Sequence, residues 1–75
     1  MKPYENLSGN SGVEAYELGP DFIRVRFRSG GNYLYTYENV GEENVEKMKE
    51  LAESGRGLAT FINQHELVRS GFVRE

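Results

Sequence analysis

Apolar and polar residues alternate strictly along residues 22–28, in the segment Phe-Ile-Arg-Val-Arg-Phe-Arg. A period of two is typical of a β-strand that buries one face and exposes the other. The pattern therefore predicts a strand with Ile23, Val25 and Phe27 on its buried face and three arginines on the opposite face.

Turn-forming residues separate this strand from two further alternating segments. Residues 13–18 alternate weakly and precede Gly19-Pro20-Asp21, and residues 33–38 follow Ser29-Gly30-Gly31-Asn32. We expect three antiparallel strands in a meander, with a tight hairpin at the paired glycines. A loop of two residues, either Gly30-Gly31 or Ser29-Gly30, places the tyrosines of the third strand on the same face as the arginines.

Helical periodicity replaces the alternation after residue 41. Apolar residues recur at helical spacing over about residues 42–53, and Gly55 is expected to end this helix in the left-handed conformation. A second apolar stripe predicts another helix up to about residue 67. Its members are Leu58, Phe61, Ile62, His65 and Val68. Leu67 and Phe72-Val73 are expected to return to the core as a short tail.

These elements predict an α+β fold, namely a three-stranded antiparallel β-meander with two helices packed on one face. The domain covers residues 13–75. Residues 1–12 are rich in Gly, Ser and Asn and lack periodicity, so we expect a flexible N-terminal leader. The predicted core consists of Ile23, Val25, Phe27, Leu34, Met48, Leu51, Phe61 and Ile62.

Two short helices cover only one face of such a sheet, so the other face is expected to stay at least partly open. It is predicted to carry three arginines interleaved with three tyrosines: Arg24, Arg26, Arg28, Tyr33, Tyr35 and Tyr37. Aromatic rings stack on unpaired bases and guanidinium groups contact phosphates, so this face suits single-stranded nucleic acid. Cross-strand Arg–Tyr pairs also stabilise hairpins, and both residue types are enriched at protein interfaces. A purely structural role and a protein-binding role therefore stay open.

Two further positions are candidates for chemistry. Arg56 lies between Gly55 and Gly57 beside the start of the second helix, where backbone N–H groups can hold a phosphate. The same residues suit a plain turn between helices. His65 falls in the apolar stripe, so we expect it to be half-buried with its ring nitrogens hydrogen-bonded.

Composition narrows the class of function. The chain has 75 residues, a net charge of −3, one histidine and no cysteine, which excludes disulfides, thiol nucleophiles and zinc–thiolate sites. No carboxylates are spaced to face each other across a cleft, so we expect neither an enzyme nor a cofactor or metal site. No apolar run approaches the ~18 residues of a membrane span, and no signal peptide is recognisable, which favours the cytoplasm.

Charge is distributed unevenly despite the acidic total. Residues 22–37 carry a local charge of +3, and residues 38–53 carry a local charge of −4. The acidic segment is typical of a solvated helix face, whereas the basic segment coincides with the predicted open sheet face.

Several short motifs occur in a recognisable order: Ile-Arg-Val-Arg-Phe-Arg-Ser-Gly-Gly at residues 23–31, a Tyr-x-Tyr motif, Met-Lys-Glu-Leu-Ala at residues 48–52, Gly55-x-Gly57, and Phe-Ile-Asn at residues 61–63. Over residues 13–70 the chain resembles the KTSC domain family, which takes its name from a C-terminal extension of some lysyl-tRNA synthetases and also occurs as small stand-alone proteins. The Tyr-x-Tyr motif matches either Tyr33–Tyr35 or Tyr35–Tyr37, and glycine follows Val40 where the family commonly has proline.

RNA binding has been proposed for the KTSC family because of its attachment to a tRNA-charging enzyme. The resemblance therefore implies a small non-enzymatic module that binds single-stranded RNA or tRNA. The alternative is a module for protein–protein interaction or self-association that uses the same face or a sheet edge. The sequence leaves the oligomeric state open.

Overall fold

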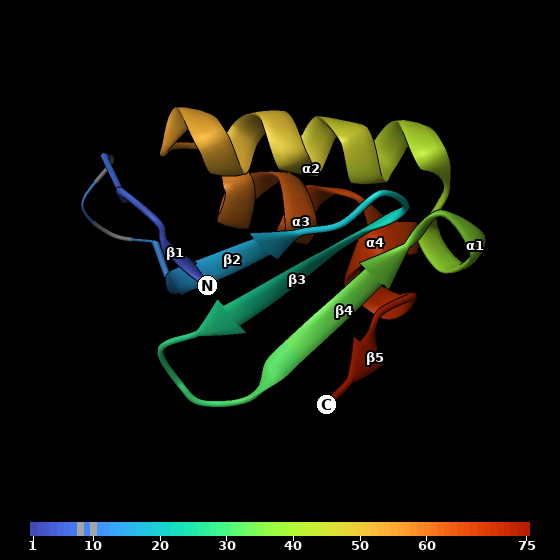
Figure 1. Cartoon of the computed structure of the whole chain (residues 1–75), viewed down its shortest axis with the longest axis horizontal. Helices are drawn as coiled ribbons and strands as arrows, with labels where there is room; N and C mark the ends of the chain where they lie inside the picture. The colour runs from blue at the N-terminus through green and yellow to red at the C-terminus, as the bar shows by residue number, and fades with distance from the viewer. Residues whose placement is uncertain (8, 10) are drawn as a thin grey trace.

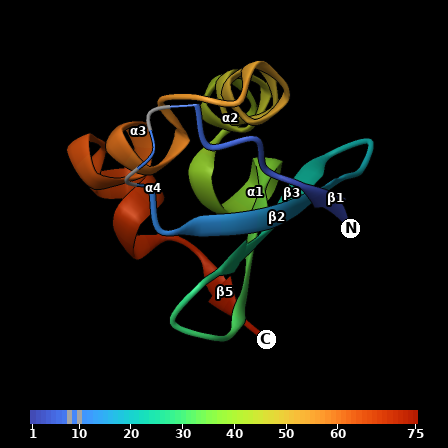
Figure 2. The same cartoon turned by 90° about the vertical axis from the view of Figure 1, so that its left-hand side faces the viewer.

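The computed structural model describes residues 1–7, 9 and 11–75, which form one antiparallel sheet and four helices. The strands lie side by side in chain order: β1 (Lys2–Pro3), β2 (Val13–Leu18), β3 (Phe22–Phe27), β4 (Asn32–Thr36) and β5 (Val73–Arg74). The helices are α1 (Tyr37–Val40), α2 (Glu42–Ser54), α3 (Leu58–Gln64) and α4 (Glu66–Ser70). The longest helix, α2, and α3 lie over the same side of the sheet (Figure 1 and Figure 2).

The α+β class is confirmed, but the predicted counts of three strands and two helices are wrong. The sheet has five strands because each end of the chain adds a strand of two residues, β1 beside β2 and β5 beside β4. Two residues are too few to produce a periodic pattern, so the sequence carried no signal for either strand.

The prediction of a flexible leader over residues 1–12 is wrong for its first residues. Lys2 and Pro3 pair with β2, and Tyr4 is buried. The backbone N–H of Leu58 donates a hydrogen bond to the Tyr4 hydroxyl at 3.3 Å. The pairing with β2 and the buried side chain of Tyr4 thus anchor a segment that has no periodicity. Ser8 and Asn10, also within the predicted leader, lie outside the described residues.

The β3–β4 hairpin overturns the predicted arrangement of the tyrosines. Ile23 is paired with Tyr35 and Val25 with Tyr33. The N–H of Phe27 donates to the carbonyl of Gly31 at 3.4 Å, which leaves three loop residues instead of two. Because an odd loop shifts the register by one, Tyr33 and Tyr35 face the helices and not the side of the arginines.

Gly30 makes this odd loop possible. Its φ is +98°, a conformation that other residues adopt only with strain, and its N–H donates to the carbonyl of Phe27 at 3.0 Å. The same register places Leu34 opposite Arg24 on the open face, so its predicted place in the core is wrong.

The first predicted helix is confirmed as α2. It ends at Gly55, whose φ of +81° and N–H bonds to the carbonyls of Leu51 and Ala52 are those expected of a glycine cap. The second predicted helix is interrupted: His65 is extended, and the chain turns there from α3 into α4. This break leaves Leu67 56% exposed and Val68 buried, so the predicted return of Leu67 to the core is wrong.

The core lies between the sheet and the helices. Four of the eight predicted core residues, Ile23, Val25, Met48 and Ile62, are buried, and Phe27, Leu51 and Phe61 are partly buried against them. The largest fully buried side chain is that of Tyr35. None of the helices in the described part of the chain is both long and apolar enough to cross a membrane.

Candidate aromatic cleft and open sheet face

The open face of the sheet centres on Arg24, whose charge is balanced by two carboxylates. Its guanidinium donates to a Glu75 carboxylate oxygen at 2.5 Å and forms a second ion pair with Glu17. It also lies over the ring of Phe22, 5.3 Å from the centroid. The hydrogen bond to Glu75 raises the pKa of Arg24, and the same contact lowers the pKa of Glu75. Arg24 is thus tied within the domain instead of being free to meet a phosphate.

The other predicted arginines are spread over the surface. Arg26 donates to the side-chain oxygen of Asn32 at 3.3 Å on the open face, and Arg28 is exposed in the hairpin loop. Arg56 is exposed in the turn between α2 and α3. The first N–H of α3, that of Leu58, donates to the Tyr4 hydroxyl and is not free for an anion, and the phosphate site beside Arg56 stays a prediction.

Tyr37 is separated from the other two predicted tyrosines. It begins α1, and its hydroxyl donates to a carboxylate oxygen of Glu46 at 2.5 Å. The ammonium of Lys49 lies 2.9 Å from Glu46 and 5.7 Å from the centre of the Tyr37 ring. The hydrogen bond to Glu46 raises the pKa of Tyr37 to about 12. Tyr37 therefore joins α1 to α2 and takes no part in a site with Tyr33 and Tyr35.

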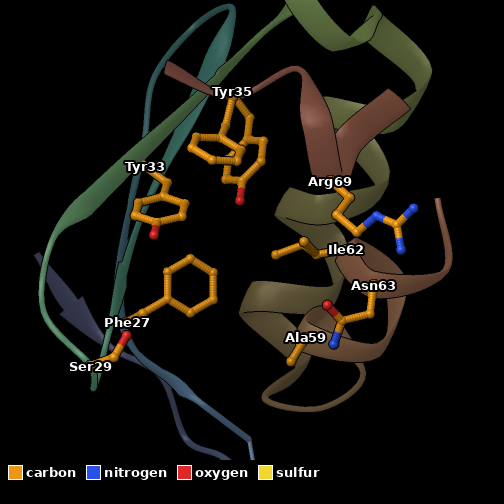
Figure 3. A pocket seen from close by; sticks show the side chains of 9 residues that line it. Phe27, Ser29, Tyr33, Tyr35, Ala59, Ile62, Asn63 and Arg69 are labelled. Carbon is orange, nitrogen blue, oxygen red and sulfur yellow. The ribbon is translucent and has the colours of Figure 1, made fainter. Parts of the chain in front are cut away.

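Tyr33 and Tyr35 instead line a cleft between the sheet and the C-terminal helices (Figure 3). Its volume is about 370 Å³. The sheet side supplies Phe27, Tyr33 and Tyr35 from its strands, Ser29 from the hairpin loop and Phe72 from the residue before β5. The helices supply Ala59, Ile62, Asn63 and Arg69. We call this site the aromatic cleft.

Contacts among the rings hold one wall of the aromatic cleft in place. Tyr33 stacks on Phe72 at 4.4 Å between centroids with planes 16° apart, and Phe27 meets Tyr33 at 5.0 Å in a tilted arrangement. The guanidinium of Arg74 lies 5.8 Å from the centre of the Tyr33 ring. Burial raises the pKa of Tyr35, so its hydroxyl stays protonated and able to donate. The wall is organised before any ligand arrives.

The opposite wall supplies polar groups and a positive charge. Figure 3 shows Asn63 and Ile62 facing the aromatic rings across the cleft, whereas Arg69 directs its guanidinium away from the rings. Arg69 is exposed and forms no ion pair with any other described residue. The part of the cleft that the structure describes contains no acidic side chain. Its lining is thus cationic although the chain has a net charge of −3.

Sequence reasoning found two residues of the aromatic cleft, Tyr33 and Tyr35, but placed them on the wrong face. It did not identify Arg69, Asn63 or Phe72 as site residues. The expected return of Phe72 to the core agrees with the structure, because this side chain is partly buried against the core. Arg69 and Asn63 are ordinary polar helix residues, and the position of Arg69 in α4 depends on the break at His65.

His65 is exposed, so its predicted half-buried position is wrong. Its ring stacks on Phe61 with centroids 4.0 Å apart, and its Nδ1 lies 2.8 Å from the Phe61 carbonyl. The extended backbone at the α3–α4 junction turns the side chain out of the apolar stripe. No group of three or more His, Cys, Asp or Glu side chains within the described residues is arranged to hold a metal ion.

A scan against protein-family models, a search of curated proteins and a search of solved structures found no match to this chain.

Proposed function

We propose that this protein is a small non-enzymatic binding module that takes single-stranded RNA, including unpaired segments of tRNA, at the aromatic cleft. The observation that carries the proposal is that aromatic rings and an unpaired arginine line the same cleft, from which acidic side chains are absent among the described residues. We also propose that the chain belongs to the KTSC domain family, on the motifs described above.

Each part of the aromatic cleft has a role in this proposal. A base packs against the aromatic wall, which is worth ~1–3 kcal/mol per base in single-strand binding. Arg69 swings towards the phosphate of the bound nucleotide, because its side chain is exposed and long enough to change rotamer. The acidic face of α2 repels the remaining backbone, so affinity depends on the few contacts in the cleft.

The proposal is tested by fluorescence titration with a short labelled RNA at about 50 and about 200 mM salt. Arg69→Gln should weaken binding and flatten the dependence on salt by about one charge. Arg56→Gln makes the same change of charge at an exposed position outside the cleft and should have less effect. Wild-type protein that does not bind RNA at the lower salt concentration would contradict the proposal.

A second candidate function is protein–protein interaction or self-association through the open face. It is favoured by the neutralised Arg24 network, next to which Val73 is 45% exposed and paired with the half-buried Leu34. Sedimentation of wild type and Val73→Glu would test it. Self-association that is insensitive to salt and lost in Val73→Glu would support this candidate, and a monomer at all concentrations would contradict self-association.

A further inference from the structure

The size of the aromatic cleft limits what portion of a nucleic acid can enter. Its volume of about 370 Å³ lies near the lower end of the range of about 300–1,000 Å³ found for small-molecule sites. Its two walls come from different layers, the sheet on one side and α3 and α4 on the other (Figure 3). A ligand therefore lies between two walls of an open cleft, whereas the predicted sheet surface is a single platform.

The polar groups of the aromatic cleft suit the edge of one heterocyclic ring. The hydroxyls of Tyr33 and Tyr35 are absent from the hydrogen bonds found among the described residues, and both can donate and accept. The amide of Asn63 adds two donors and an acceptor from the other wall. Nucleobases carry donors and acceptors on their edges and an apolar π-face, a combination that matches these two tyrosines and the amide within the aromatic cleft.

The positive charge of the cleft lining favours a ligand that also carries an anionic group. Arg69, whose guanidinium is directed away from the rings and turns towards a bound anion, is the cation of the lining, and acidic side chains are absent from the lining that the structure describes. Arg74, which lies over Tyr33, is a second cation next to the aromatic wall. A nucleotide has the required combination, because its phosphate is joined to the base through the ribose and reaches the rim while the base lies between the two walls.

Taking the proposed function as its basis, we infer that the aromatic cleft holds one unstacked nucleotide, its base between the aromatic wall and α3 and its phosphate on Arg69. RNA is then recognised by extrusion of a single base into the domain and not by stacking of successive bases along the sheet. A free nucleoside 5′-monophosphate contains every group that the cleft contacts, so it is itself a ligand.

Competition with free nucleotides tests this inference. Each of the four ribonucleoside 5′-monophosphates is added to the complex with labelled RNA, and also to the free protein while its NMR spectrum is recorded. At least one nucleotide should displace the RNA and shift the signals of Tyr33, Tyr35 and Asn63. Ribose 5-phosphate, which lacks the base, should do neither at the same concentration.

Variants that remove single polar groups separate base recognition from folding. Tyr35→Phe keeps the buried ring and removes the hydroxyl, and should weaken nucleotide binding about three- to tenfold. Tyr37→Phe is the matched control, because that hydroxyl bonds to Glu46 outside the cleft. Asn63→Ala should weaken binding and the neighbouring exposed Gln64→Ala should not.

The outcomes distinguish this inference from the proposed function. RNA binding that no nucleotide displaces, with Tyr35→Phe and Asn63→Ala unchanged, would overturn the single-nucleotide site and leave RNA binding intact. Absence of binding by both RNA and nucleotides would overturn both. A peptide with an aromatic side chain that shifts the cleft signals, where nucleotides do not, would also overturn the inference and assign the cleft to a protein partner.

Discussion

The two faces of the sheet are built from neighbouring residues of the same strands, yet they differ in which of their groups are already paired. The face towards the helices carries Tyr33 and Tyr35, which line a cleft with Arg69. The open face carries Arg24, whose charge is balanced by Glu17 and Glu75. A cation that is already paired offers little to a phosphate. Arg69 forms no ion pair with another described residue, so its charge is available to a ligand of the cleft once its guanidinium turns towards the rings. Under the proposed function, the partners that these charged residues already have decide more than their residue types.

The largest expected difference between the two faces is in stability. Tyr35 is 1% exposed, so Tyr35→Ala should lower the free energy of unfolding by ~3–5 kcal/mol, which is enough to unfold a domain of this size. Leu34→Ala, one residue away on the open face, should cost much less because Leu34 is only half-buried. Thermal or urea unfolding of both variants measures the difference. Equal losses would show that the two faces are buried alike.

The next effect concerns the loop that decides which residues share a face. Gly30 has a positive φ, and no described atom lies within 4 Å of the place where a Cβ would be. Gly30→Ala should therefore destabilise the domain by about 1–2 kcal/mol through backbone strain alone. Gly12→Ala is the control, because that glycine also has open space around it but no positive φ. A Gly30→Ala variant as stable as wild type would contradict the odd-length loop.

A smaller effect is expected from the paired charges of the open face. Arg24→Gln should cost at most about 1 kcal/mol, because exposed ion pairs contribute little. Glu75 has a lowered pKa in the folded state, so its contribution is present at neutral pH and is lost as the pH falls from its ordinary value through the lowered one. Unfolding measured across acidic pH should show that Arg24→Gln loses less stability on acidification than wild type. An identical pH dependence of the two proteins would show that Glu75 does not pair with Arg24.

The smallest effect lies outside both faces, at Tyr37. Its pKa is raised from 10.0 to about 12, so the stabilising contact with Glu46 is complete below pH 10 and is lost as the pH rises through about 12. The absorbance of tyrosinate is followed during an alkaline titration of wild type and of Tyr37→Phe. The difference between the two curves should correspond to one tyrosine with this raised pKa. A Tyr37 that titrates near 10 would show that the bond to Glu46 does not form.

The sequence predicted the class of fold and the elements with a long periodic pattern. The spacing of apolar residues predicts the central strands and α2, and the glycine at position 55 predicts where α2 ends. It did not predict β1 and β5, because two paired residues leave no pattern, and their formation depends on the sheet that is already present.

The candidate site was less predictable than the fold because its position depended on a single residue of loop length. Both an even and an odd loop are compatible with consecutive glycines, and each gives a consistent alternation of side chains. The alternation of side chains is also compatible with buried tyrosines. Tyr35 is an example, because it is buried in the core and also lines the cleft. Arg69 lines the cleft because the helix is interrupted at His65 and the chain continues as α4. No helix-breaking residue in the sequence indicated this interruption.

The central claim is that ligand binding occurs on the tyrosine side of the sheet, and the five tyrosines of the chain test it directly. Protein labelled with 3-fluorotyrosine gives one ¹⁹F signal per tyrosine, and single-Tyr→Phe variants assign them. Titration with single-stranded RNA should shift the signals of Tyr33 and Tyr35, which line the aromatic cleft, and leave those of Tyr4, Tyr16 and Tyr37 in place. RNA that binds with Tyr33 and Tyr35 unchanged would contradict the claim.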